Sequence, residues 1–202
     1  MVKIKICGIT RKIEIEYVNE LLPDFMGFVF AKNSRHYVSP EDARVFQSFL
    51  NPKIKVVGVF VDEPMDSVID IVKRNSIDII QLHGSEDQRY ISKLRNNLNL
   101  PIIKAFSVTC EEDAKKAAVS KSDYILLDNK KGGSGEIFDW SFINALQRPY
   151  FLAGGLESEN VAFAINTLHP YAVDASSKLE KDGVKDYEKM RAFINAIRNS
   201  GG

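Results

Sequence analysis

Two side chains capable of proton transfer close runs of apolar residues in this sequence. Cys7 ends the run Lys-Ile-Lys-Ile-Cys, and Asp128 ends the run Tyr-Ile-Leu-Leu-Asp. A thiolate can act as a general base or a nucleophile, and a carboxyl group that is partly removed from water can act as a general acid. The two residues are therefore candidates for acid–base chemistry, provided that the fold brings them together.

The alternation of side chains along the first run decides what surrounds Cys7. In a strand, Lys3, Lys5 and Cys7 share one face, whereas Ile4 and Ile6 share the other. An ammonium group near a thiol favours the thiolate, so we expect Lys5 to lower the pKa of Cys7 from its ordinary value of about 8.5. A buried structural thiol is the alternative interpretation. The position at the end of a strand, before a glycine, favours the functional one.

Two aspartates follow the same pattern. Asp128 and Asp174 each close an apolar strand, so each is expected to lie partly out of water, which favours the protonated form and suits a carboxyl group to proton donation. The alternative for both is a loop carboxylate that accepts backbone N–H groups. Asp128 is therefore the candidate acid.

Small residues mark a candidate phosphate site. Gly154 and Gly155 follow one apolar run, and Ser176 and Ser177 follow the next. In barrels of alternating strands and helices, the loops after strands seven and eight commonly hold phosphate through backbone N–H groups. Simple turn chemistry is the alternative. The run at 132–135 (Gly-Gly-Ser-Gly) indicates either a lid or a tether. Nucleotide-binding glycine fingerprints are absent from the sequence.

The three histidines do not indicate a metal centre. His36, His83 and His169 show no paired spacing with cysteines or carboxylates, so we expect no metal and no cofactor. His83 lies two residues after Gln81 at the end of a strand, and alternation places both on the inner face. His83 is therefore either a ligand contact or a polar side chain with an internal partner, and His169 is expected to be structural.

The order of elements predicts how these residues meet. Eight short apolar runs begin roughly 22 to 29 residues apart, and amphipathic segments lie between most of them. This alternation indicates parallel strands with right-handed crossovers and predicts one compact (β/α)8 barrel over residues 1–202, with some short or missing helices. An open, doubly wound sheet is the alternative. The runs span residues 3–7, 25–30, 54–61, 78–83, 101–106, 123–128, 150–154 and 171–175.

Composition narrows the class of partner. The 202 residues carry 27 basic and 27 acidic side chains, a balance that argues against a general nucleic-acid binder. No stretch approaches the roughly 20 apolar residues of a membrane span, and no signal peptide is evident. Two distant cysteines, Cys7 and Cys110, are expected to be reduced. We therefore expect a cytoplasmic protein, monomeric or homodimeric, that binds a small phosphorylated molecule.

The ordered set of motifs resembles the phosphoribosylanthranilate isomerase family along essentially the whole chain. This resemblance implies a TIM barrel that carries out an Amadori rearrangement in tryptophan biosynthesis without a cofactor. It implies that Cys7 is the general base, that Asp128 is the general acid and that Asp174 contacts the substrate. The motifs are Lys5-Ile6-Cys7-Gly8-Ile9-Thr10, Gly27-Phe28-Val29-Phe30, Ser34-Arg35-His36-Tyr37-Val38-Ser39-Pro40, Val57-Gly58-Val59-Phe60-Val61, Gln81-Leu82-His83-Gly84, Leu126-Leu127-Asp128, Gly132-Gly133-Ser134-Gly135, Phe138-Asp139-Trp140, Leu152-Ala153-Gly154-Gly155-Leu156, Asn160-Val161, Val173-Asp174-Ala175-Ser176-Ser177 and Gly183-Val184-Lys185-Asp186.

The sequence departs from the family pattern at two positions. The family usually has an arginine at the position of His36, where it pairs with the anthranilate carboxylate, and here Arg35 lies one residue earlier. Either Arg35 reaches the carboxylate or His36 partly replaces the arginine. Lys178 stands where the family more often has glycine, and it either obstructs the phosphate loop or adds a cation beside it. A related barrel enzyme acting on another phosphorylated metabolite and a catalytically inactive binding barrel are the competing functions.

Overall fold

The computed structural model describes residues 1–128 and 146–200 of the chain. Eight parallel strands close into a barrel in chain order, because β1 pairs with both β2 and β8. This closure confirms the predicted (β/α)8 barrel and excludes the open, doubly wound sheet. The strands are β1 (Lys3–Cys7), β2 (Phe25–Val29), β3 (Lys55–Phe60), β4 (Ile79–Leu82), β5 (Ile102–Ser107), β6 (Tyr124–Asp128), β7 (Tyr150–Leu152) and β8 (Ala172–Ala175).

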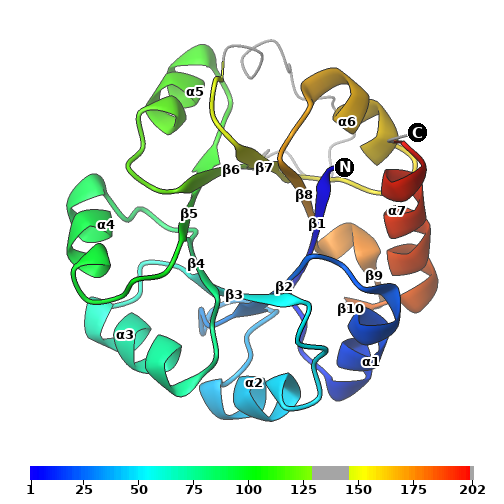
Figure 1. Cartoon of the computed structure of the whole chain (residues 1–202), viewed down its shortest axis with the longest axis horizontal. Coiled ribbons are helices and arrows are strands. Elements are labelled where there is room, and N and C mark those ends of the chain that lie inside the picture. The colour runs from blue at the N-terminus through cyan, green and yellow to red at the C-terminus, as the bar shows by residue number, and fades with distance from the viewer. Residues whose placement is uncertain (129–145, 201–202) are drawn as a thin grey trace.

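Helices surround the barrel as an outer ring (Figure 1). Four of them have only eight residues, about two turns, so the prediction of short helices is confirmed. The predicted loop at 129–137, including the glycine-rich run, and the motif at 138–140 lie outside the described residues. The helices are α1 (Lys12–Leu21), α2 (Pro40–Gln47), α3 (Met65–Arg74), α4 (Gln88–Arg95), α5 (Glu111–Ala118), α6 (Val161–Leu168) and α7 (Tyr187–Asn199).

One additional motif follows β8. The short 3-10 helix η2 (Ser177–Leu179) leads into a two-stranded antiparallel ribbon of β9 (Glu180–Lys181) and β10 (Val184–Lys185). In Figure 1 this ribbon lies beside α1 and α7 rather than in the barrel wall. It was not predicted from the sequence, and it supplies two charged side chains to the site described below.

Local sequence explains where the helices begin and which face they bury. The hydroxyl of Ser39 accepts the backbone N–H of Asp42 at 3.0 Å, and Pro40 occupies the first turn, as its fixed φ favours. Asp186 caps α7 in the same way. The apolar stripe of α7 is buried as its spacing predicts, through Met190, Phe193, Ile194 and Ile197.

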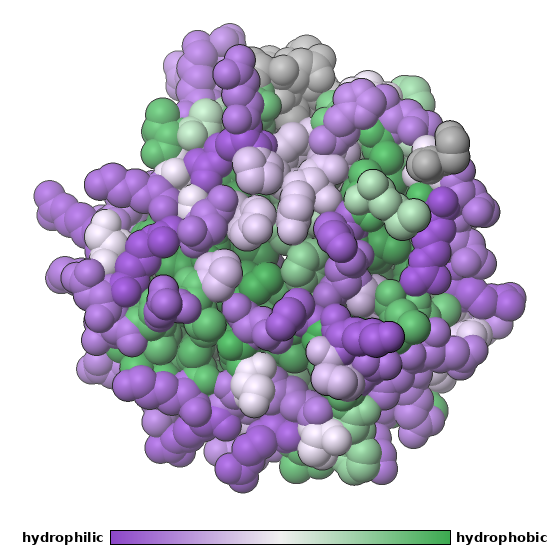
Figure 2. All heavy atoms as spheres, viewed as in Figure 1, coloured by the Kyte–Doolittle hydropathy of each residue, from purple (hydrophilic) through white to green (hydrophobic). Residues whose placement is uncertain are grey.

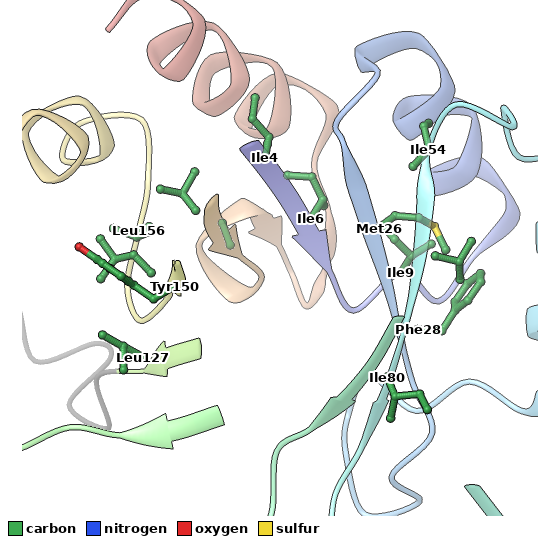
Figure 3. Close-up of a cluster of buried hydrophobic side chains, with 14 of the residues drawn as sticks. Ile4, Ile6, Ile9, Met26, Phe28, Ile54, Ile80, Leu127, Tyr150 and Leu156 are labelled. Carbon is green, nitrogen blue, oxygen red and sulfur yellow. The ribbon is translucent and has the colours of Figure 1, made fainter. Parts of the chain in front are cut away.

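The barrel wall separates two apolar layers. Ile4 and Ile6 point outward into the layer between strands and helices, which Figure 3 shows together with Met26 and Phe28 of the neighbouring strand. Cys7 belongs to the second layer, inside the barrel, as alternation predicted. Figure 2 shows hydrophilic side chains around the outer ring, with hydrophobic atoms visible between them. Among the described residues, no helix is both long and apolar enough to cross a membrane.

Candidate functional site

A pocket of about 500 Å³ opens at the carboxyl ends of the strands. This is the end at which barrel enzymes of this architecture place their chemistry. All ten side chains or loop residues singled out from the sequence line it, and Gln81 and Lys178 join them. The ten are Cys7, Arg35, His36, His83, Asp128, Gly154, Gly155, Asp174, Ser176 and Ser177.

Cys7 lies over a buried ion pair. The Nζ of Lys5 is 2.7 Å from Oδ2 of Asp174, and the Lys5 side chain is fully buried. The other carboxylate oxygen of Asp174, Oδ1, has no hydrogen-bond partner among the described residues. Gly27 on β2 makes room for the thiol, because a Cβ at this position would lie 2.8 Å from the sulfur of Cys7. The thiol is therefore held between a glycine and a charged pair.

The electrostatics of Cys7 correct one expectation from the sequence. Burial raises the pKa of the Cys7 thiol above its ordinary value, although Lys5 acts in the opposite direction. The negative charge of Asp174 adds a smaller contribution in the same direction as burial, because it opposes the thiolate. For Lys5, the charges of Asp174 and Cys7 outweigh burial and raise its pKa, so it stays protonated. Burial likewise raises the pKa of Asp174, against the attraction of Lys5.

Asp128 lies beside His83 in the pocket. The Oδ2 of Asp128 is 3.4 Å from Nε2 of His83, and both side chains keep about a third of their surface exposed at 35% each. Asp128 is therefore partly removed from water, as expected for the end of an apolar strand. The other ring nitrogen of His83, Nδ1, lies 2.9 Å from the amide nitrogen of Gln81. His83 thus has an internal partner and also lines the pocket, and its contact with a ligand stays a prediction.

The loops after β7 and β8 also line the pocket. Gly154 and Gly155 have φ of 92° and 68°, values that favour glycine, and no atom lies near the position of a Cβ on Gly155. Backbone conformation therefore accounts for Gly155. Lys178 lines the pocket, but its ammonium is 3.1 Å from Oε1 of Glu157, so it bridges the two loops.

A charged cluster borders the pocket beside these loops. Glu180 lies 2.6 Å from the Nζ of Lys185, 2.8 Å from Nε2 of His36 and 3.0 Å from the guanidinium of Arg35. Glu180 and Lys185 are buried, whereas Arg35 is 61% exposed. The imidazole of His36 packs so closely over Gly8 that a Cβ there would lie 2.9 Å from the ring.

The pKa values of Glu180 and His36 in this cluster are both lowered, for different reasons. Burial opposes the charge of Glu180, yet hydrogen bonding and attraction from Lys185 hold its pKa below the ordinary value. Burial and the charge of Lys185 lower the pKa of His36, despite the pull of Glu180. His36 is therefore neutral near pH 7, and Arg35 is the exposed cation of the cluster. Sequence reasoning missed Glu180 and Lys185, although the dipeptide Asp182-Gly183 is a turn signal that could have predicted the ribbon carrying them.

The remaining cysteine and histidine lie elsewhere. Cys110 is exposed and, like Cys7, carries a free thiol. His169 ends α6 with a φ of 47° and lies before β8, at the opposite end of the barrel from the pocket. No group of three or more metal-ligating side chains occurs among the described residues.

The fold and the pocket define a (β/α)8-barrel protein with acid–base groups and glycine-rich loops at the carboxyl ends of its strands. Residues 4–196 match the family model described as N-(5'-phosphoribosyl)anthranilate (PRA) isomerase. The chain belongs to this family and is an isomerase.

Individual relatives agree with this assignment. An N-(5'-phosphoribosyl)anthranilate isomerase from Thermoanaerobacter sp. (strain X514) is 43% identical over 204 residues, covering 98% of each chain. A crystal structure of phosphoribosyl anthranilate isomerase from Thermotoga maritima has a TM-score of 0.91 and 38% identity, covering 98% of this chain and all of that one. A phosphoribosyl anthranilate isomerase solved in complex with reduced 1-(o-carboxyphenylamino)-1-deoxyribulose 5-phosphate has a TM-score of 0.89 and 37% identity, with the same coverage.

Proposed function

We propose that this protein converts N-(5-phosphoribosyl)anthranilate into 1-(2-carboxyphenylamino)-1-deoxyribulose 5-phosphate, an Amadori rearrangement of tryptophan biosynthesis. The observation that carries the proposal is that Cys7 and Asp128 line one pocket together with the loops after β7 and β8. Family membership supports the same reaction. The substrate is a phosphorylated small molecule, as expected from the sequence, and the proposed chemistry needs acid–base groups alone.

Asp128 acts first, as the general acid. Its proton passes to the ring oxygen of the substrate furanose while the bond between C1 and that oxygen breaks. The lone pair of the anthranilate nitrogen forms the new C=N bond, which gives an open-chain iminium. Asp128 is left as a carboxylate.

Cys7 acts second, as the general base. Its thiolate takes the proton from C2, and the electrons of that C–H bond form the C1=C2 double bond as the iminium becomes a neutral enolamine. Tautomerisation of the enolamine then gives the ketone. One proton leaves Asp128 and one arrives at Cys7, so the enzyme must exchange both protons before the next turnover.

The two ends of the substrate find different surroundings in the pocket. We assign the phosphate to the Gly154-Gly155 and Ser176-Ser177 loops, where backbone N–H groups can bind it. The unpartnered Oδ1 of Asp174 is suited to accept a hydrogen bond from a sugar hydroxyl. Arg35 is the better candidate for the anthranilate carboxylate, since it is exposed and charged whereas His36 is half-buried and neutral near pH 7.

The direct test is turnover of purified protein. Loss of the fluorescence of N-(5-phosphoribosyl)anthranilate would be followed with and without enzyme, and the expected result is conversion to the ketose product. Absence of turnover by folded wild-type protein would contradict the proposal and favour the inactive binding barrel. Turnover of a different phosphorylated metabolite alone would favour the related barrel enzyme. The cytoplasmic location and the monomeric or homodimeric state stay predictions.

A further inference from the structure

A short chain of polar side chains runs from the barrel interior to Asp128. Gln81 lies on the inner face of β4 with only 1% of its surface exposed. Its amide nitrogen is 2.9 Å from Nδ1 of His83, and Nε2 of His83 is 3.4 Å from Oδ2 of Asp128. The amide oxygen of Gln81 has no hydrogen-bond partner among the described residues. Burying a polar side chain with one unsatisfied atom costs free energy. The hydrogen bond to His83 is the contact that offsets this cost for Gln81.

The backbone around His83 is held independently of its ring. The His83 N–H donates to the carbonyl of Phe60 at 2.8 Å, which continues the pairing of β3 and β4. The next carbonyl, that of Gly84, accepts a hydrogen bond from Nζ of Lys104 at 2.7 Å, and Lys104 is itself paired with the buried Glu86 at 3.1 Å. The imidazole therefore extends from a fixed backbone, and Gln81 is left to decide which ring nitrogen carries the proton.

The contact with Gln81 selects one tautomer. An amide nitrogen can only donate, so Nδ1 of His83 accepts from Gln81 and cannot carry a proton. The neutral ring then carries its proton on Nε2, which faces Asp128. We propose that Gln81 and His83 are positioning residues for Asp128: Gln81 fixes the Nε2–H tautomer of His83, and this N–H stabilises the carboxylate that forms as Asp128 delivers its proton.

This role rests on the proposed acid step of Asp128 and says which group stabilises the carboxylate that this step produces. Negative charge develops on Asp128 in the transition state for ring opening, and a donor that is already aimed at the carboxylate needs no reorganisation. The His83 N–H therefore strengthens the acid without taking up the proton itself. The interaction should raise kcat more than it strengthens substrate binding, since the negative charge on Asp128 appears only during the reaction.

The first experiment reads the tautomer without using activity. Nitrogen-15 NMR of protein labelled at histidine distinguishes a protonated ring nitrogen from a bare one, and His83→Gln identifies the signals of His83. At pH 8 we expect His83 to show a bare Nδ1 and a protonated Nε2. In Gln81→Glu the new carboxylate accepts a hydrogen bond, so Nδ1 should become protonated. A protonated Nδ1 in the wild-type protein would overturn the proposal, whatever the enzyme turns over.

The second experiment measures kinetics with matched variants. His83→Met removes the donor and should lower kcat about 10- to 100-fold, the range for a hydrogen bond to a charged group. His83→Gln places an amide N–H near the position of Nε2 and should restore most of that loss. His169→Asn, at the opposite end of the barrel, should leave kcat unchanged.

The kinetic outcomes separate three explanations. A rise in KM with unchanged kcat in His83→Met would mean that His83 only binds substrate, and it would overturn the positioning role. Equal losses in His83→Met and His83→Gln, with unchanged circular dichroism, would do the same. Failure of the wild-type protein to turn over its substrate would instead contradict the proposed function, while the NMR result would still report the Gln81–His83 contact.

Discussion

Lys5 and Asp174 form an ion pair of 2.7 Å directly beneath Cys7, and both side chains are almost completely withdrawn from water. Two buried charges are tolerated only when each compensates the other, because an unpaired buried charge is strongly destabilising. The pair links the first and last strands of the barrel, β1 and β8, at the point where the sheet closes. It therefore contributes both to closure of the barrel and to the charge that Cys7 experiences.

Removing one partner of this pair should be more damaging than removing both. Lys5→Met leaves Asp174 as an uncompensated buried carboxylate, so we expect the free energy of unfolding to fall by about 3–5 kcal/mol. The double variant Lys5→Met/Asp174→Leu should recover much of that loss. Urea denaturation of the two variants and the wild type measures this. A double variant that is less stable than Lys5→Met would show that the pair does more than neutralise a buried charge.

The raised pKa of Cys7 predicts how its reactivity depends on pH. The thiolate is the reactive form, and a pKa raised by burial means that its fraction at pH 7 is small and grows as pH increases. In a Cys110→Ser background, alkylation of Cys7 by iodoacetamide should accelerate up to and beyond pH 9. Lys5→Met removes a cation that favours the thiolate, so its curve should move to higher pH. A rate that levels off near pH 7 would contradict the direction of the shift.

The assigned acid and base predict a specific kinetic defect. Cys7→Ser replaces the thiol by a much weaker acid, and Asp128→Asn removes the ionisable group, so each should lower kcat by about 100- to 10,000-fold. Product should still bind, because neither change alters the phosphate loops, and titration with product measures this. Cys110→Ser, at an exposed thiol, is the matched control for the cysteine change. Near-normal turnover in either site variant would refute the role assigned to that residue.

Sequence periodicity predicted the elements of the barrel more readily than the partners of its charged side chains. Alternation placed Cys7 inside and Ile6 outside because a strand has a fixed period of two. The same pattern could not predict that burial would outweigh Lys5 and raise the pKa of Cys7. The degree of burial depends on how tightly the neighbouring strands pack around the thiol, which the sequence of one strand does not show. It also could not reveal that Glu180 contacts His36, because these residues are 144 positions apart in the chain.

The cluster around Glu180 predicts which cation meets the anthranilate carboxylate. Arg35 is exposed and permanently charged, so at pH 8 Arg35→Met should raise KM about 10-fold or more, and Arg35→Lys should restore only part of the affinity because it lacks a planar fork. His36→Gln should change KM less, since burial and Lys185 keep His36 neutral at this pH. Steady-state kinetics measures both. A larger effect at His36 than at Arg35 would reverse the assignment.

Lys178 offers a final test, because its ammonium bridges the two loops assigned to phosphate. It is 3.1 Å from Oε1 of Glu157, and both side chains are more than a third exposed at 39% and 36%. If Lys178 adds a cation to the site, Lys178→Met should weaken competitive inhibition by inorganic phosphate by about 2- to 5-fold, the range for an exposed charge pair. Glu157→Gln should strengthen it, since the ammonium is then free to meet the phosphate. Both effects should shrink in high salt. Tighter phosphate binding in Lys178→Met would instead identify Lys178 as an obstruction, and Glu157 would then be the residue that holds it away from the loop.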